Sequence, residues 1–132
     1  HDLQREIDQR KNPWSINSLA AVAGEIMFTD QEYIGKTRKL ICSQRRYVCE
    51  RLDADPNFKT FHAHANFVLV KILNDRFTSG DVFDAAIRQN LMVRDCSTFP
   101  FLNNKYFRLC FMLPEQNERL LRVLLDLASL SQ

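Results

Sequence analysis

Arg108 is the charged residue whose neighbours in the sequence most directly indicate a chemical role. Alternation along a strand over residues 106–112 places it mid-strand, on the face opposite Phe107, Leu109 and Phe111. A guanidinium among apolar neighbours needs an anion, and its planar fork suits a carboxylate because two parallel hydrogen bonds can form. On the residues alone, a structural ion pair is the preferred interpretation, and an anionic group of a bound ligand is the alternative.

A second arginine, Arg94, closes an expected short strand and is followed by Asp95, Cys96, Ser97 and Thr98. These side chains and their backbone donors could meet an oxyanion. If the strands that carry Arg94 and Arg108 are neighbours, the two arginines form an anion pocket. The local sequence favours the alternative of an ordinary surface turn in which Arg94 pairs with Asp95.

Other candidate residues carry weaker signals. His62 and His64 alternate as a strand would place them, on one face, which is a possible two-ligand metal set. No third ligand has a fixed spacing to them, so an ordinary sheet position is preferred and no metal is expected. Cys96 beside Arg94 could have a lowered pKa, but no histidine or asparagine pattern supports a nucleophilic cysteine.

The composition indicates one compact folded domain. The chain has 132 residues, 45% of them hydrophobic and 26% charged, close to the averages of globular proteins. Its net charge of +2 is too small to indicate a nucleic-acid partner, and its longest apolar runs are far shorter than a membrane helix. With four cysteines that form no CxxC pair and no signal-peptide pattern, we expect a cytoplasmic protein with reduced thiols and no membrane partner.

Caps, apolar periodicity and turn residues predict an α+β domain: a small, mostly antiparallel sheet of about three or four strands with helices packed on one face. Residues 1–13 are read as a polar tail. Helices are expected over 19–28 after a cap at Asn17, from the cap Thr29-Asp30 to Leu52, over 81–88 after a cap at Ser79, and over 115–130 after Pro114. Strands are expected over 58–61, 65–73, 91–94 and 106–113, and the second, apolar on both faces, is placed centrally.

Four segments taken together resemble a known family. The order and spacing of residues 12–20, 65–70, 93–97 and 106–109 resemble the C-terminal part of the class I/II, fold-type I aminotransferases. Within that family the chain looks most like the branch that contains histidinol-phosphate aminotransferase and threonine-phosphate decarboxylase. The stretch from residue 94 to residue 108, with 115–117 after it, resembles the decarboxylase more closely.

The resemblance implies a pyridoxal 5'-phosphate enzyme in which a large domain holds the cofactor. Residues 14–132 would form the C-terminal small domain that closes over the substrate, and residues 1–13 the end of the connection from the large domain. Arg108 matches the family arginine that binds the substrate α-carboxylate, and Arg94 matches the one that helps to hold the phosphate of an amino acid phosphate ester. No lysine here has the Ser-x-Ser-Lys-like context of the cofactor lysine, so this chain alone is expected to be inactive, with no catalytic or cofactor-binding residue.

The resemblance also leaves alternatives open. The decarboxylase belongs to cobalamin biosynthesis and the aminotransferase to histidine biosynthesis, and either full-length enzyme is expected to be a homodimer. His62-Ala63-His64 stands where relatives tend to have a Pro-Ser-like or Pro-Gly-like pair, which leaves the exact substrate open. A different class of function is a stand-alone α+β ligand-binding or interaction module whose arginines are structural. Exposed apolar surface at Trp14 and along the helix that begins near Leu19 predicts self-association of this chain.

Overall fold

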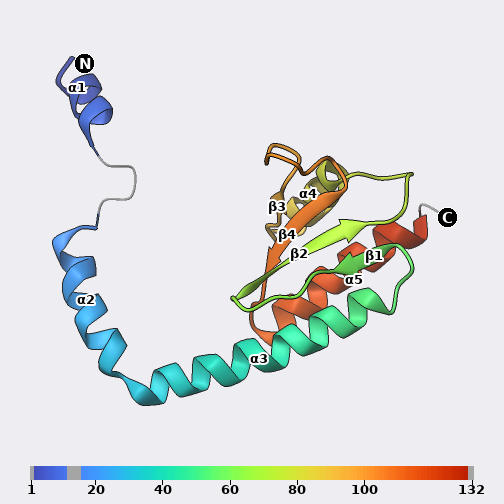
Figure 1. Ribbon diagram of the computed structural model, residues 1–132, viewed down its shortest axis with the longest axis horizontal. Coiled ribbons are helices and arrows are strands. Elements are labelled where there is room, and N and C mark those ends of the chain that lie inside the picture. The colour runs from blue at the N-terminus through green and yellow to red at the C-terminus, as the bar shows by residue number, and fades with distance from the viewer. Residues whose placement is uncertain (1, 12–15, 131–132) are drawn as a thin grey trace. The chain divides into compact units, whose positions relative to one another are not determined.

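The computed structural model describes residues 2–11 and 16–130 (Figure 1). The chain divides into two compact units, with the boundary between Thr37 and Arg38. The predictions made for residues 12 and 13 and for Trp14 lie outside the described residues. Within the described ranges, no helix combines the length and the apolar character that crossing a membrane requires.

The first unit contains α1 (Asp2–Arg10), α2 (Ser18–Thr29) and the beginning of α3 (Gln31–Asp53). Two side chains cap α2 and α3 as predicted: Asn17 Oδ1 accepts from Ala20 N at 2.8 Å, and Asp30 Oδ1 accepts from Tyr33 N at 2.9 Å. α1 runs for 9 residues, where the sequence predicted a polar tail with a single turn of helical spacing. α2 buries none of its side chains.

The second unit is built on a four-stranded antiparallel sheet, which confirms the predicted α+β class (Figure 1). Its strands are β1 (Phe58–Thr60), β2 (Phe67–Ile72), β3 (Arg94–Asp95) and β4 (Tyr106–Cys110). They lie in the order β1-β2-β4-β3, so β2 has a partner on each side, as its apolar sequence predicted.

One face of this sheet is buried under helices. Successive side chains of a strand point to opposite faces, so alternate residues of β2 and β4 share the buried face. The core joins α3, α4 (Ser79–Ile87) and α5 (Pro114–Leu130) to that face. From the two central strands it takes Val68, Val70, Ile72, Phe107 and Leu109. The opposite face of the two strands is only partly covered or exposed, so the second apolar face of β2 is not buried within this chain.

Two element ends differ from the sequence prediction for identifiable reasons. The N-cap of α4 is Thr78, not Ser79: Thr78 N donates to Asp81 Oδ2 at 2.8 Å, and Asp81 N donates to Thr78 Oγ1 at 3.4 Å. Strand β4 ends at Cys110 instead of continuing to residue 113, because the backbone N–H and C=O of Met112 form hydrogen bonds with the side chain of Asn117 and not with a neighbouring strand. Asn117 Oδ1 accepts from Met112 N at 3.0 Å, and its Nδ2 donates to Met112 O at 2.8 Å.

The strand expected over 91–94 is also shorter than predicted. Ladder pairing is limited to Arg94 and Asp95, and Leu91 and Val93 are buried before the strand begins. Their apolar character reflects packing into the core and not membership of the sheet, and the two causes look alike in a short apolar run.

Candidate functional site

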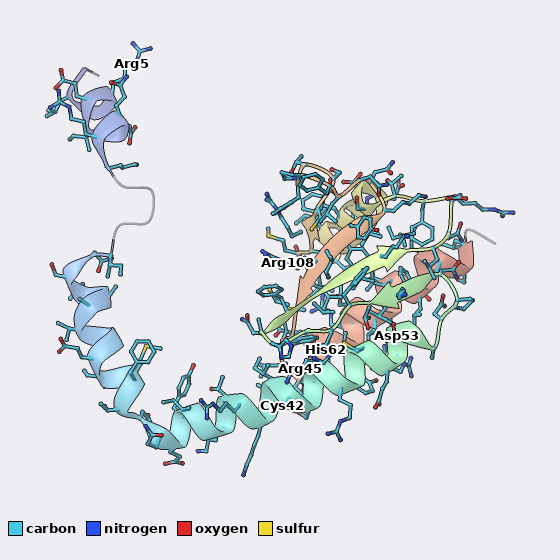
Figure 2. The ribbon with its side chains drawn as sticks, in the orientation of Figure 1. Arg5, Cys42, Arg45, Asp53, His62 and Arg108 are labelled. Carbon is cyan, nitrogen blue, oxygen red and sulfur yellow. The ribbon has the colours of Figure 1, made fainter. Side chains whose placement is uncertain are left out.

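The two candidate arginines are brought together by the sheet. In the pairing of β3 with β4, Arg94 lies directly opposite Arg108. Both line one cleft of about 870 Å³, whose walls also include Phe83 of α4, Thr98 and Cys110. This arginine cleft lies within the range of volumes typical of small-molecule sites. Figure 2 shows Arg108 on β4, at the side of the sheet where β3 lies.

Neither arginine is neutralised by a carboxylate of the described chain. The Cζ atom of Arg108 lies 4.7 Å from the ring centroid of Phe67, and that of Arg94 lies 5.5 Å from the ring centroid of Phe99. Among the described residues, no ion pair involves either guanidinium. Aromatic faces orient the two cations without cancelling their charge, so the structural ion pair preferred from the sequence is not formed.

Asp95, the nearest acidic residue in the sequence, has other partners. Its Oδ1 accepts from Ser79 Oγ at 2.7 Å and from Ser97 N at 2.9 Å, and its Oδ2 accepts from Ser97 Oγ at 2.8 Å. Burial raises the pKa of Asp95, but these hydrogen bonds and the charge of Arg94 outweigh burial and leave the pKa lowered. The expected Arg94–Asp95 surface turn is therefore not an ion pair: the carboxylate is held by serine.

Cys96 is not suited to nucleophilic chemistry. Cys96 is buried, and its Sγ donates to Arg94 O at 3.5 Å. Burial raises the pKa of the Cys96 thiol, and the charges of Arg108 and Arg94 only partly offset that effect. The lowered pKa considered from the sequence is therefore wrong, because proximity to arginine was weighed without the burial.

The two histidines lie elsewhere. His62 and His64 lie in the connection between β1 and β2. Their alternation had suggested positions on a strand. Their rings meet edge to face, with centroids 4.4 Å apart. They line a separate hollow, and no set of three histidine, cysteine, aspartate or glutamate side chains suited to a metal ion occurs among the described residues.

Sequence reasoning missed the partners of two residues that line the arginine cleft, Arg108 and Asp95. Phe67 was assigned only to the sheet, although the register places it opposite Cys110, diagonal to Arg108. Ser79 was assigned to a helix cap, yet its side chain is fully buried and donates to Asp95. Neither role has a local signal, because each depends on pairing between segments far apart in the chain.

Comparison with known proteins gives a consistent set of relatives. No protein-family model matches the chain. It is 28% identical over 122 residues to a putative threonine-phosphate decarboxylase of Caldanaerobacter subterraneus subsp. tengcongensis, covering 92% of this chain and 33% of the relative. It is 26% identical over 125 residues to a histidinol-phosphate aminotransferase of Methanopyrus kandleri, covering 95% of this chain and 32% of the relative.

Solved structures lead to the same group. The histidinol-phosphate aminotransferase of Clostridium acetobutylicum superposes with a TM-score of 0.77 at 26% identity, covering 97% of this chain and 38% of that one. The L-threonine-O-3-phosphate decarboxylase of Porphyromonas gingivalis has the same fold, with a TM-score of 0.72 at 20% identity, covering 97% of this chain and 39% of that one.

These similarities confirm the predicted resemblance to aminotransferases, and the chain has their fold. Its relatives include threonine-phosphate decarboxylases and histidinol-phosphate aminotransferases. The chain spans about a third of the length of these curated relatives, which is consistent with one C-terminal domain of a longer enzyme.

Proposed function

We propose that this chain is the C-terminal domain of a pyridoxal-phosphate enzyme that acts on an amino acid phosphate ester, most like L-threonine-O-3-phosphate decarboxylase in cobalamin biosynthesis. The observation that carries the proposal is the pair formed by Arg94 and Arg108, opposite each other and free of any carboxylate among the described residues. A substrate with one carboxylate and one phosphate supplies two anions for these two cations.

The surroundings of the two arginines support a division of labour. Arg108 is half-buried and lies against Phe67, which suits a planar guanidinium that grips a carboxylate with two hydrogen bonds. Arg94 is exposed, which suits the larger and more strongly hydrated phosphate. Each hydrogen bond to a charged group contributes about 1.5–3 kcal/mol, enough to set both substrate affinity and orientation.

Pyridoxal phosphate, the cofactor that the family implies, does not fit the residues present in this cleft. Covalent attachment of this cofactor requires a lysine amine, and none of the described residues lining the cleft is a lysine. Lys105, next to β4, donates to Asn74 O at 2.8 Å and to Phe77 O at 3.0 Å. We therefore assign the cofactor, which acts as the electron sink, to the remainder of the longer enzyme, and we expect this chain alone to be inactive.

The proposal is tested in the longer enzyme that contains this chain. Arg108→Ala should raise KM and lower kcat, because the arginine holds the carboxylate that must be oriented for reaction. Arg94→Ala should reduce the preference for phosphothreonine over threonine about tenfold or more. Arg122→Ala is the matched control, since this arginine lies on α5 next to Glu118 and does not line the cleft. Kinetics for the Arg108 variant equal to those of the control would remove the proposed role.

Histidinol-phosphate aminotransferase is the second candidate, because relatives of both kinds match the chain at similar identity. Release of carbon dioxide from phosphothreonine would identify the decarboxylase. Formation of glutamate from 2-oxoglutarate in the presence of histidinol phosphate would identify the aminotransferase. A protein of the proposed length that catalyses neither reaction would favour the non-enzymatic ligand-binding module.

Domain boundaries and assembly complete the proposal. Residues 14–132 form the small domain, residues 1–13 end the connection to the large domain, and the longer enzyme is a homodimer. Sedimentation velocity on the longer enzyme measures its mass directly. A monomer across a hundredfold range of concentration would contradict the dimer.

A further inference from the structure

A second hollow lies between α3 and the β1–β2 connection, and it shares no residue with the arginine cleft. Its volume is about 620 Å³, and Figure 2 shows Arg45 and Asp53 on α3 with His62 beside them. Two guanidinium groups, from Arg45 and Arg46, and two imidazoles, from His62 and His64, line it. We refer to it as the α3 hollow.

Asp53, the acidic residue that lines the α3 hollow, accepts hydrogen bonds from Thr60. Asp53 Oδ1 accepts from Thr60 N at 2.7 Å, and Asp53 Oδ2 accepts from Thr60 Oγ1 at 2.7 Å. Among the described residues, no carboxylate forms an ion pair with Arg45 or Arg46. Two guanidinium groups therefore line the hollow with a single carboxylate, so basic side chains outnumber acidic ones there.

The donors in the α3 hollow are held in place before any ligand arrives. Arg45 Nη1 donates to Ala63 O at 2.8 Å, and Arg45 Nη2 donates to Cys42 Sγ at 3.4 Å. The remaining N–H groups of this guanidinium are left for a ligand. The edge-to-face contact between His62 and His64 orients the two rings, each of which carries at least one N–H donor.

We propose that the α3 hollow binds the phosphate group of a small phosphate monoester. A phosphate presents three acceptor oxygens in different directions, which suits donors arriving from a helix on one side and a loop on the other. A planar carboxylate would use only part of that set. The exposed ring of Phe61, which also lines the hollow, offers an apolar surface to the organic part of the ester. This inference does not depend on the proposed function.

The test uses the 132-residue chain, isotopically labelled, and follows the imidazole signals of His62 and His64 by NMR. His62→Gln and His64→Gln assign the two signals. Titration with inorganic phosphate at constant ionic strength should give saturable shifts of both. Phenyl phosphate should bind about fivefold more tightly, because its ring can pack against Phe61. Linear shifts without saturation, or equal shifts with chloride, would overturn the site, and equal affinity for the two probes would overturn the assignment to an ester.

Two variants separate this hollow from the arginine cleft. Arg46→Gln should weaken the histidine-detected affinity about tenfold. Among the described residues no ion pair holds Arg46 in the fold, so the chain should remain folded. The double variant Arg94→Gln/Arg108→Gln should leave that affinity unchanged, because neither arginine lines the hollow. The opposite pattern, with affinity retained in the first variant and lost in the second, would overturn the proposal.

Discussion

The contact between Ser79 and Asp95 makes a quantitative prediction about how the arginine cleft is held together. Ser79 is fully buried at the start of α4, and Asp95 lies on β3 next to Arg94. The hydroxyl donates to the carboxylate at 2.7 Å, and a hydrogen bond to a charged group contributes about 1.5–3 kcal/mol. Ser79→Ala should therefore destabilise the chain by about 2 kcal/mol.

Asp95→Ala should cost more, about 3 kcal/mol, because it leaves the buried Ser79 hydroxyl without an acceptor and also releases Ser97. Once Asp95 is gone, removing the Ser79 hydroxyl should cost little. The double variant should therefore be more stable than the sum of the single variants predicts, by about 1.5 kcal/mol.

Urea denaturation of the four proteins, followed by circular dichroism, measures this coupling. Ser43→Ala is the matched control, because the hydroxyl of Ser43 donates only to Leu40 O within an exposed turn of α3. Free energies that add within about 0.5 kcal/mol would refute the reasoning, since the two side chains would then act independently.

The pH dependence follows from the same contact. The folded state lowers the pKa of Asp95, because the hydrogen bonds from Ser79 and Ser97 and the charge of Arg94 outweigh burial, which raises it. The ionised carboxylate therefore stabilises the fold above the pKa it has when unfolded, near pH 4, and that stability is lost as the pH falls through the lower folded pKa. Between about pH 5 and pH 2 the wild-type chain should lose stability more steeply than Asp95→Asn, and parallel curves would contradict this assignment.

Three further changes test the core and the backbone, all by urea denaturation. Leu124→Ala should cost about 2–5 kcal/mol, because the side chain is fully buried, and a cost below 1 kcal/mol would mean that the core is not packed as described. Asn117→Ala should cost about 2–3 kcal/mol, because it removes hydrogen-bond partners from Gln44 and Met112; a neutral effect would show that these hydrogen bonds do not stabilise the fold. Phe101 has a φ of 68° and is fully exposed, so Phe101→Gly should be more stable than Phe101→Ala by about 1 kcal/mol, and the reverse order would exclude strain there.

Much of the local structure was predictable from the sequence because its causes are local. Asn17 and Asp30 cap the helices that follow them, since a short side-chain oxygen can reach free N–H groups in the first turn. Alternation along β4 separated Phe107 and Leu109 from Arg108, because side chains of a strand must point to opposite faces. The family resemblance added the class of protein, which the relatives confirmed.

The arrangement of the arginine cleft was decided by contacts between residues far apart in the sequence. The sequence could not show that β3 pairs with β4, and that pairing alone brings Arg94 opposite Arg108. Nor could it show that Asp95 is held by Ser79 from α4, which leaves both arginines without a carboxylate among the described residues. Local spacing favoured an ion pair between neighbours. A carboxylate bonds with the donors that reach it in the folded state, however, and those donors are known only when the chain is assembled.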